Sequence, residues 1–210
     1  MDRSFSMKPT ILLAILSLSA CSEAPKTATV PEKPAQTKSE PEKPAEPVSA
    51  KTAFFEMYKV ARSWAADLLP LSLVSNDVPG IKNEEGKAAM WTAIFVSPGR
   101  HEARTFSYAV VTKGTVHKGV TVGDIQPWSG ATPKSKPFQI TEFVVDSDTA
   151  YKTAYQKAAS WAKKHPDKGV AFFLGNAARF PGPVWYLLWG NNKSGYAAYV
   201  NATTGVVGTR

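Results

Sequence analysis

The side chains that could do chemistry are few, and their spacing matches no common catalytic pattern. His101, His117 and His165 lie far apart, and no pair has the His-x-x-x-His spacing that puts two imidazoles on one helical face. Glu84 and Glu85 are adjacent carboxylates in a polar stretch. The Gly-x-Ser-x-Gly, Walker A and dinucleotide-binding glycine motifs do not occur in the sequence. We therefore expect no catalytic residue, no metal site and no cofactor, and we do not expect an enzyme.

Cys21 is the one cysteine of the chain, and the residues before it predict that its thiol is acylated. Arg3 and Lys8 make the start positively charged, and residues 11–18 form an apolar run too short to cross a bilayer as a helix. Residues 18–21, Leu-Ser-Ala-Cys, then place an aliphatic and two small residues before the thiol. This stretch resembles the lipobox of bacterial lipoproteins. An ordinary signal peptide followed by an unrelated cysteine is the alternative.

The lipobox resemblance implies a membrane anchor and a location. It implies cleavage before Cys21, so that residues 1–20 are a signal peptide, and transfer of diacylglyceryl and N-acyl groups to Cys21. Several acyl chains hold a protein to a membrane far more firmly than one. Ser22 stands after the cysteine in place of Asp, which favours the outer over the inner membrane of the cell envelope, facing the periplasm. With no second cysteine, the folded part is expected to depend on core packing without disulfides.

Residues 21–50 are expected to form a disordered tether. Six prolines alternate with Glu and Lys, and Pro-Glu-Lys-Pro-Ala occurs at 31–35 and again at 41–45. A segment with so little apolar surface cannot offset the entropy of ordering itself, and proline favours the extended polyproline II conformation. We interpret the tether as a spacer between membrane and folded part. A proline-rich ligand for some partner is the alternative.

The remaining residues, 51–210, carry the basic character of the protein. They hold 19 Lys and Arg against 11 Asp and Glu, so this segment alone matches the net charge of +8 of the whole chain. A basic exported domain is attracted to anionic lipid headgroups, polyanionic glycans or acidic proteins. The charge could instead serve solubility alone. Nucleic acid is not expected as a partner of an exported chain.

The segment also contains an internal similarity that predicts two supersecondary units. Residues 58–65 and 155–162 share Tyr, Ala, Ser, Trp and Ala at an offset of 97 residues. Trp91 and Trp185 each begin an apolar, strand-like run. The units are assigned to 51–136 and 137–210. Four tryptophans that match between the units are expected in the core: Trp64, Trp91, Trp161 and Trp185.

Each unit is expected to start with a helix. In the first, apolar residues at steps of three and four make one helical face, and Pro70 ends the run. In the second, Ser147 or Asp148 caps the start, capping accounts for the neighbouring Asp146, and Pro166 ends the helix. The two expected faces are Phe54, Tyr58, Ala61, Ala65 and Leu68, then Tyr151, Tyr155, Ala158 and Ala162.

Strands are expected after each helix, joined by short loops that make neighbouring strands antiparallel. The fold class is therefore α+β, with two repeated units that each pack a helix on an antiparallel sheet. The expected strands are 71–75, 89–96, 104–112, 115–122, 138–145, 169–174, 184–189, 196–201 and 206–209.

The second unit resembles a PepSY domain. The resemblance rests on the capped, Ala-rich helix of 147–162, the strand of 185–189, and residues 196–207, which include Asn-Ala-Thr-Thr-Gly where that family typically has Asp-Ala-x-Thr-Gly. Asn201 thus replaces the usual Asp. The first unit is a fainter copy. The resemblance implies an inhibitory or interaction module of the envelope. A tandem of helix–sheet units is also similar in architecture to the β-lactamase inhibitor proteins.

Two loops contain residues suited to contact a partner. Trp128 lies in a Pro- and Gly-rich connection with Lys134 and Lys136 nearby, and Arg179 and Phe180 form a second pair of a cation and an aromatic ring. Large aromatic side chains often anchor interfaces. Trp128 could instead fix the connection to the core, Phe180 could point inward, and the lysines could be solvated.

These observations predict a lipid-anchored, periplasmic binding module that contacts an envelope protein and that inhibits or modulates a peptidase or another envelope enzyme. The alternative is a structural or assembly lipoprotein of the envelope that touches anionic glycan or lipid through its basic surface.

Overall fold

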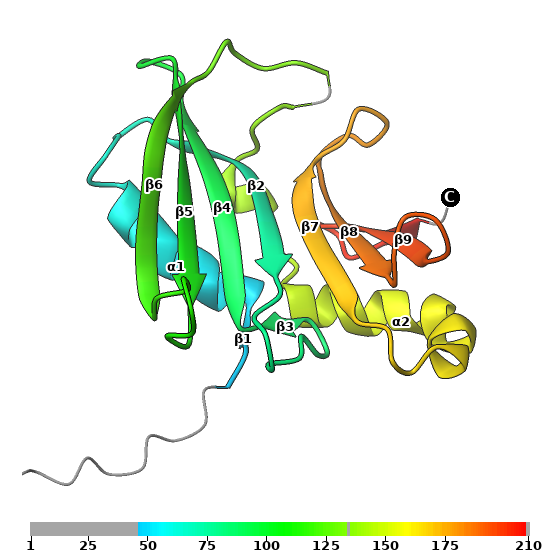
Figure 1. Cartoon of the computed structure of the whole chain (residues 1–210). Helices are drawn as coiled ribbons and strands as arrows, with labels where there is room; N and C mark the ends of the chain where they lie inside the picture. The colour runs from blue at the N-terminus through cyan, green and yellow to red at the C-terminus, as the bar shows by residue number, and fades with distance from the viewer. Residues whose placement is uncertain (1–45, 134, 209–210) are drawn as a thin grey trace, which may run out of the picture. The chain divides into compact units, whose positions relative to one another are not determined.

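The computed structural model describes residues 46–133 and 135–208 (Figure 1). Cys21, the signal peptide expected at 1–20, most of the tether expected at 21–50 and Lys134 lie outside the described residues. Within the described ranges, no helix is long and apolar enough to span a membrane.

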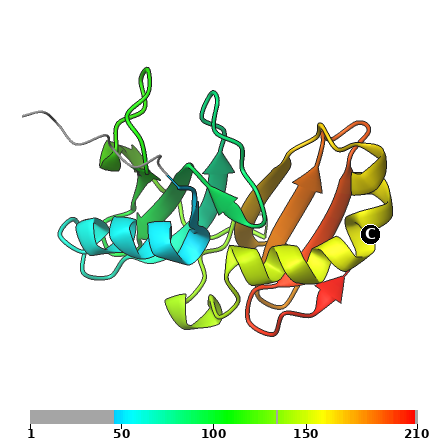
Figure 2. The same ribbon diagram turned by 90° about the horizontal axis from the view of Figure 1, so that it is seen from below.

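An eight-stranded antiparallel sheet forms the centre of the fold, and two helices pack against one of its faces (Figures 1 and 2). The helices are α1 (Ala50–Ala61) and α2 (Ser147–Lys164). This arrangement confirms the expected α+β class. In spatial order the strands are β10 (Val207–Gly208), β9 (Tyr196–Asn201), β8 (Pro183–Trp189), β7 (Val170–Asn176), β2 (Leu69–Asn76), β4 (Met90–Ser97), β5 (Glu102–Ala109) and β6 (Gly119–Pro127). A separate two-stranded pair joins β1 (Val48–Ser49) to β3 (Lys87–Ala88).

The order of the strands follows the chain on both sides of the sheet's middle. After α1 the chain lays down β2, β4, β5 and β6 as successive neighbours, and after α2 it lays down β7, β8, β9 and β10. The two sets share one sheet because β2 pairs with β7, with Leu73 opposite Leu174. Short turns connect the strands, such as 97–100 between β4 and β5, where Arg100 N donates to Ser97 O at 3.3 Å.

The prediction of a strand at 138–145 is wrong. This segment contains a short 3₁₀ helix, Ile140–Glu142, in which Gln139 N donates to the Glu142 carboxylate at 2.7 Å. Its other backbone donors are satisfied by loops and strand ends: Phe138 N bonds to Pro70 O at 2.9 Å, and Val145 N bonds to Ala202 O at 2.7 Å. With these partners supplied, the segment does not need a neighbouring strand.

Both helices differ from expectation at their ends. α1 stops at Ala61, although Ala65 and Leu68 beyond it are buried as expected. α2 is capped by Asp146, whose side chain accepts from Ser147 N at 2.7 Å, so the expected caps at Ser147 and Asp148 are wrong. The backbone of Asp146 is extended, and its carboxylate can therefore turn back toward the first helical N–H groups.

The core lies between the helices and the sheet. Trp91 and Trp185 are fully buried there, as expected, with Phe54, Phe95 and Leu187. Trp64 and Trp161 also pack against the core, as expected, but from its edge, and both are only half-buried. Trp64 lies three residues beyond the last residue of α1, and Trp161 lies in the last turn of α2.

The two helices begin side by side, and α2 caps α1. Ser49, the N-cap of α1, makes no side-chain capping bond. Instead Ala50 N donates to Ser147 Oγ at 2.8 Å, and Lys51 N donates to Asp146 Oδ1 at 2.9 Å. The free N–H groups at the start of one helix are thus satisfied by the first residues of the other, which ties the two halves of the molecule together.

Candidate functional site

Three aromatic residues lie in register on the face of the sheet that the helices do not cover. Phe173 on β7 is opposite Tyr186 on β8, and Tyr186 is opposite Tyr199 on β9. Their strand neighbours Phe172, Trp185 and Val200 are buried toward the helices. Because side chains alternate along a strand, the three aromatic rings point away from the helices.

Phe180, from the β7–β8 turn, extends this group. Its ring centroid is 5.2 Å from that of Tyr199, which is 5.1 Å from that of Tyr186. Phe173 is 38% exposed, an unusual exposure for phenylalanine on a sheet. We call Phe173, Phe180, Tyr186 and Tyr199 the aromatic row.

Arg179 lies on the aromatic row. Its guanidinium carbon is 4.4 Å from the Tyr199 ring centroid and 5.2 Å from that of Phe180. Both distances suit a cation–π interaction, which holds the exposed cation in a defined place. The structure therefore brings Arg179 and Phe180 together, and it joins them to tyrosines that are distant in sequence.

The other residues suggested as partner contacts lie elsewhere. Lys136 is exposed, and its carbonyl accepts from Asn176 Nδ2 at 3.1 Å, so it is close to the end of β7 that leads to Arg179. Trp128 is half-buried and lies in the other half of the sheet. Its backbone N–H donates to His101 O at 2.9 Å beside the β4–β5 turn. The described contacts do not connect Trp128 to the aromatic row.

Sequence reasoning missed Phe173, Tyr186 and Tyr199 as surface residues. The available signal was strand alternation: the strands containing them also contain Phe172, Trp185 and Val200 at the adjacent positions, and only one set can face the helices. Their combination into one row depends on cross-strand register, which no local pattern reveals.

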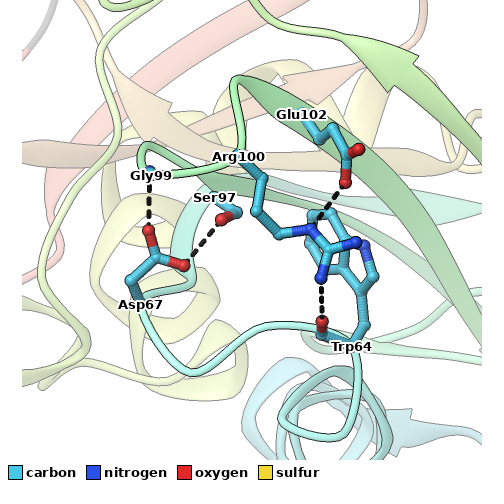
Figure 3. Close-up of polar contacts among 6 residues, drawn as sticks. All are labelled: Trp64, Asp67, Ser97, Gly99, Arg100 and Glu102. Atoms are coloured by element: carbon cyan, nitrogen blue, oxygen red, sulfur yellow. Dashed lines mark hydrogen bonds and ion pairs between the residues drawn. The ribbon is translucent and has the colours of Figure 1, made fainter.

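The carboxylate–hydroxyl pair of Asp67 and Ser97 is structural and not nucleophilic (Figure 3). Ser97 Oγ donates to Asp67 Oδ1 at 2.6 Å, and Gly99 N donates to Asp67 Oδ2 at 2.7 Å. Ser97 is fully buried, and its proton is held by a carboxylate without an intervening imidazole. The Ser97 and Gly99 donors lower the pKa of Asp67 below its ordinary value of 3.8. The pair latches the β2 side of the sheet to the β4–β5 turn.

Arg100 completes this latch. Its Nε donates to Glu102 Oε2 at 2.9 Å and its Nη1 donates to Trp64 O at 3.1 Å (Figure 3). The Trp64 indole N–H is buried without a hydrogen-bond partner in the described structure, while its ring packs on Phe106 at 6.3 Å between centroids. Trp64 thus contributes its ring and its carbonyl to packing. Over residues 46–133 and 135–208, no group of three or more His, Cys, Asp and Glu is placed to hold a metal ion.

Comparisons with known proteins show no family. No protein-family model matches the chain, and no curated protein matches it. One solved structure with similarity to the chain is a crystal structure of a candidate lipoprotein from Clostridium difficile 630, at 12% sequence identity and a TM-score of 0.48. The match covers 75% of this chain and 90% of that one. Likeness at this level transfers neither fold nor function.

Proposed function

We propose that the protein is a lipid-anchored binding module of the bacterial cell envelope, and that its folded part binds another protein through the aromatic row. The observation that carries this proposal is the contact between Arg179 and the rings of Phe180 and Tyr199 on a sheet face free of helices. Tyrosine and arginine are among the residue types that most often dominate the binding energy of protein interfaces, and aromatic residues are enriched there.

The partner's surface follows from the chemistry of this face. The rings need an apolar centre on the partner, and Arg179 and the exposed Lys136 need acidic groups around it. The excess of basic residues in 51–210 would also speed the encounter with an acidic partner. An envelope enzyme, such as a peptidase, that is inhibited or modulated when this face covers it is the finer form of the proposal.

The proposed architecture is two PepSY-like units. In support, the helices begin 97 residues apart, and each is followed by four strands of the eight-stranded sheet in chain order. Trp91 Nε1 donates to Val48 O at 3.0 Å, and Trp185 Nε1 donates to Val145 O at 2.8 Å. Each acceptor is the residue before the N-cap of the helix that starts its unit, so matching side chains perform the same task in both halves.

The proposed anchor is diacylglycerol and an N-acyl chain on Cys21, with the outer membrane favoured by Ser22. The lipobox pattern at 18–21 supports this part. The tether would let the folded part reach a partner away from the membrane surface.

Site-specific crosslinking in cells tests the binding surface. A photoreactive amino acid replaces Tyr186 in the full chain, and the matched control places it at Lys157, which is exposed on α2. We expect a discrete protein adduct from position 186 that disappears when Arg179→Ala is added, and no such adduct from position 157. Equal adducts from both positions, or none from position 186, would overturn the proposal.

The alternative, an assembly lipoprotein that contacts anionic glycan or lipid, is distinguished by salt. That role would be favoured if the purified protein bound anionic vesicles or glycan, if this binding weakened steeply with salt, and if Arg179→Ala did not change it. The reason for the salt dependence is that ions screen diffuse basic surfaces.

A further inference from the structure

A groove of about 440 Å³ lies on the helix side of the sheet, away from the aromatic row. α2 lines it through Tyr151, Tyr155 and Lys163, and Trp189 at the end of β8 contributes to its wall. The loop between β2 and β3 closes another side with Glu84 and Glu85. The groove therefore joins a loop of the first half to the helix of the second.

A tight turn holds the two glutamates in place. Glu84 and Lys87 exchange backbone hydrogen bonds of 3.1 and 2.8 Å across the turn. Gly86 has a φ of +85°, and a Cβ there would lie 2.4 Å from Asp148 Cα, so only glycine allows the turn to approach α2 this closely. Ser147 Oγ also donates to Gly86 O at 2.5 Å. The turn is thus fixed against the start of α2 by contacts on both sides.

Glu85 occupies a backbone conformation that glutamate rarely adopts. Its φ is +49°, in the left-handed region. Non-glycine residues in this region persist where the surrounding contacts require them, and they concentrate at functional sites. Here the result is that an exposed carboxylate at Glu85 is held at the mouth of the groove beside Tyr151.

The groove is walled by aromatic rings. Tyr151 and Tyr155 stack with their centroids 5.4 Å apart, and Tyr151 is 6.0 Å from the Trp189 ring. Trp189 is 3% exposed and so forms a fixed surface, whereas both tyrosines are half-buried and keep a side open to solvent.

The charges around the rings are unequal along the groove. Glu84 is paired with Lys82 at 3.2 Å, and Lys168 is paired with Asp167 at 2.9 Å. Burial raises the pKa of Tyr151 above its ordinary value of 10.0, and the neighbouring Tyr155, Glu85 and Glu84 raise it further. The negative field of the two glutamates therefore reaches the Tyr151 ring.

Basic groups lie at both ends of the groove, and Lys82 and Lys152 are the ones near the glutamates. Lys163 and His165 line the groove near the C-terminus of α2, and the His165 ring is 4.3 Å from Trp161. Within the described ranges, no ion pair neutralises Glu85. A carboxylate without an ion pair in these ranges and two half-buried aromatic rings therefore meet at one end of the groove, with Lys152 beside them.

The matching position in the first half has no such opening. Phe54 lies 97 residues before Tyr151 and is fully buried, with Phe143 packed edge-on against it at 5.4 Å. The second half has a tyrosine at this position, and the tyrosine remains half-exposed. A residue needed only for core packing would not require the hydroxyl or the opening.

We propose that this groove binds a cationic side chain, the ammonium of lysine or the guanidinium of arginine, presented by a peptide. The cation would lie against the faces of Tyr151 and Tyr155 and pair with the carboxylate of Glu85. Aromatic faces attract cations through their negative quadrupole, and a nearby carboxylate adds direct Coulomb attraction. The net charge of +8 disfavours cations over most of the surface, so such binding is local to the groove.

The test measures binding of dye-labelled tripeptides to the full chain by fluorescence anisotropy. The probes are Gly-Lys-Gly and Gly-Arg-Gly, with Gly-norleucine-Gly as the uncharged match and Gly-Glu-Gly as the acidic one. We expect the cationic probes to bind at least tenfold more tightly than the norleucine probe. Equal affinity for the norleucine probe, or preference for the acidic probe, would overturn the proposal.

Variants separate the two contributions. Glu85→Gln keeps the size of an exposed side chain and is expected to weaken cation binding at least fivefold, while Glu56→Gln on α1 leaves it unchanged. Tyr151→Phe keeps the ring and should retain most binding, and Tyr155→Leu should lose it. If Glu85→Gln bound the cationic probes as tightly as the unmodified protein, the groove would not be the site. A negative result for the groove would not contradict binding through the aromatic row, because crosslinking from position 186 tests that surface separately.

Discussion

Trp91 and Trp185 meet edge to face at the middle of the core, with ring centroids 6.4 Å apart and planes at 69°. Each indole N–H reaches past the start of a helix to a backbone carbonyl, Val48 O for Trp91 and Val145 O for Trp185. The pair thus anchors both helix starts to the sheet at the place where the two halves join.

Removing either indole N–H should destabilise the protein by a similar amount. Trp91→Phe and Trp185→Phe each leave a carbonyl without its donor and a small gap, which we expect to lower the free energy of unfolding by about 2–4 kcal/mol. Trp128→Phe is the control, since Trp128 is half-buried outside this core. Urea unfolding followed by circular dichroism measures all three. A cost confined to one of the two core tryptophans would argue against equivalent roles.

Ser147 is expected to matter more than its size suggests. Its hydroxyl accepts from Ala50 N and donates to Gly86 O, both buried, so Ser147→Ala leaves two backbone groups unsatisfied. We expect a loss of about 1–3 kcal/mol for each buried group without a partner. Ser160→Ala, the same change at an exposed site on α2, should cost little. Chemical unfolding measures the free energy of unfolding of both variants. Equal stabilities would contradict the role of Ser147 in capping α1.

Gly86 separates backbone strain from steric contact. Gly86→Ala should cost about 1–2 kcal/mol for the left-handed conformation and a further 1–3 for the contact with Asp148. Gly119 has a similar φ of +91° with no atom within 4 Å of the added Cβ. Gly119→Ala should therefore show the first cost alone. Thermal unfolding of the two variants gives the difference, and a Gly86→Ala protein as stable as Gly119→Ala would refute the close approach.

Asp67 should make the free energy of unfolding decrease at acidic pH. Its pKa is lowered in the folded protein, so the unfolded chain takes up the proton first as the pH falls. The stabilisation is full above the ordinary pKa of 3.8 and is lost as the pH falls below that value and through the lower pKa of the folded protein. Asp67→Asn should be less stable at neutral pH, and its deficit should shrink over that window. Asp124→Asn, exposed on β6, is the control. A deficit that stays constant down to pH 2 would be inconsistent with this assignment.

Cys21 carries the anchoring proposal. Cys21→Ser removes the acceptor of the acyl groups, so the protein should move from the membrane fraction to the soluble envelope fraction, and metabolic labelling with a fatty acid should be lost. Ser22→Asp in the unchanged lipobox tests the choice of membrane. Retention of Cys21→Ser in washed membranes would remove the basis for the anchor.

The local pattern of apolar and polar residues was enough to predict most helices and strands. The alternation around Trp185 and the three- and four-residue steps around Ala158 reflect burial on one side, which sequence records directly. It failed at 138–145, where loops at Pro70 and Ala202 supply the hydrogen bonds that a strand would otherwise need. It also failed at the end of α1, because Ala65 and Leu68 are buried without being helical.

By itself the sequence determined the α+β class, the presence of both helices, and the burial of Trp91 and Trp185, since these depend on periodicity and on how residues divide between water and the interior. Arg179 and Phe180 could likewise be singled out from their types. Only the tertiary structure decided that Tyr199 lies under Arg179, that Asp146 caps the helix beginning at Ala50, and that Glu85 faces Tyr151. These contacts join residues far apart in the chain, and strand register and helix packing, which set them, are properties of the whole fold.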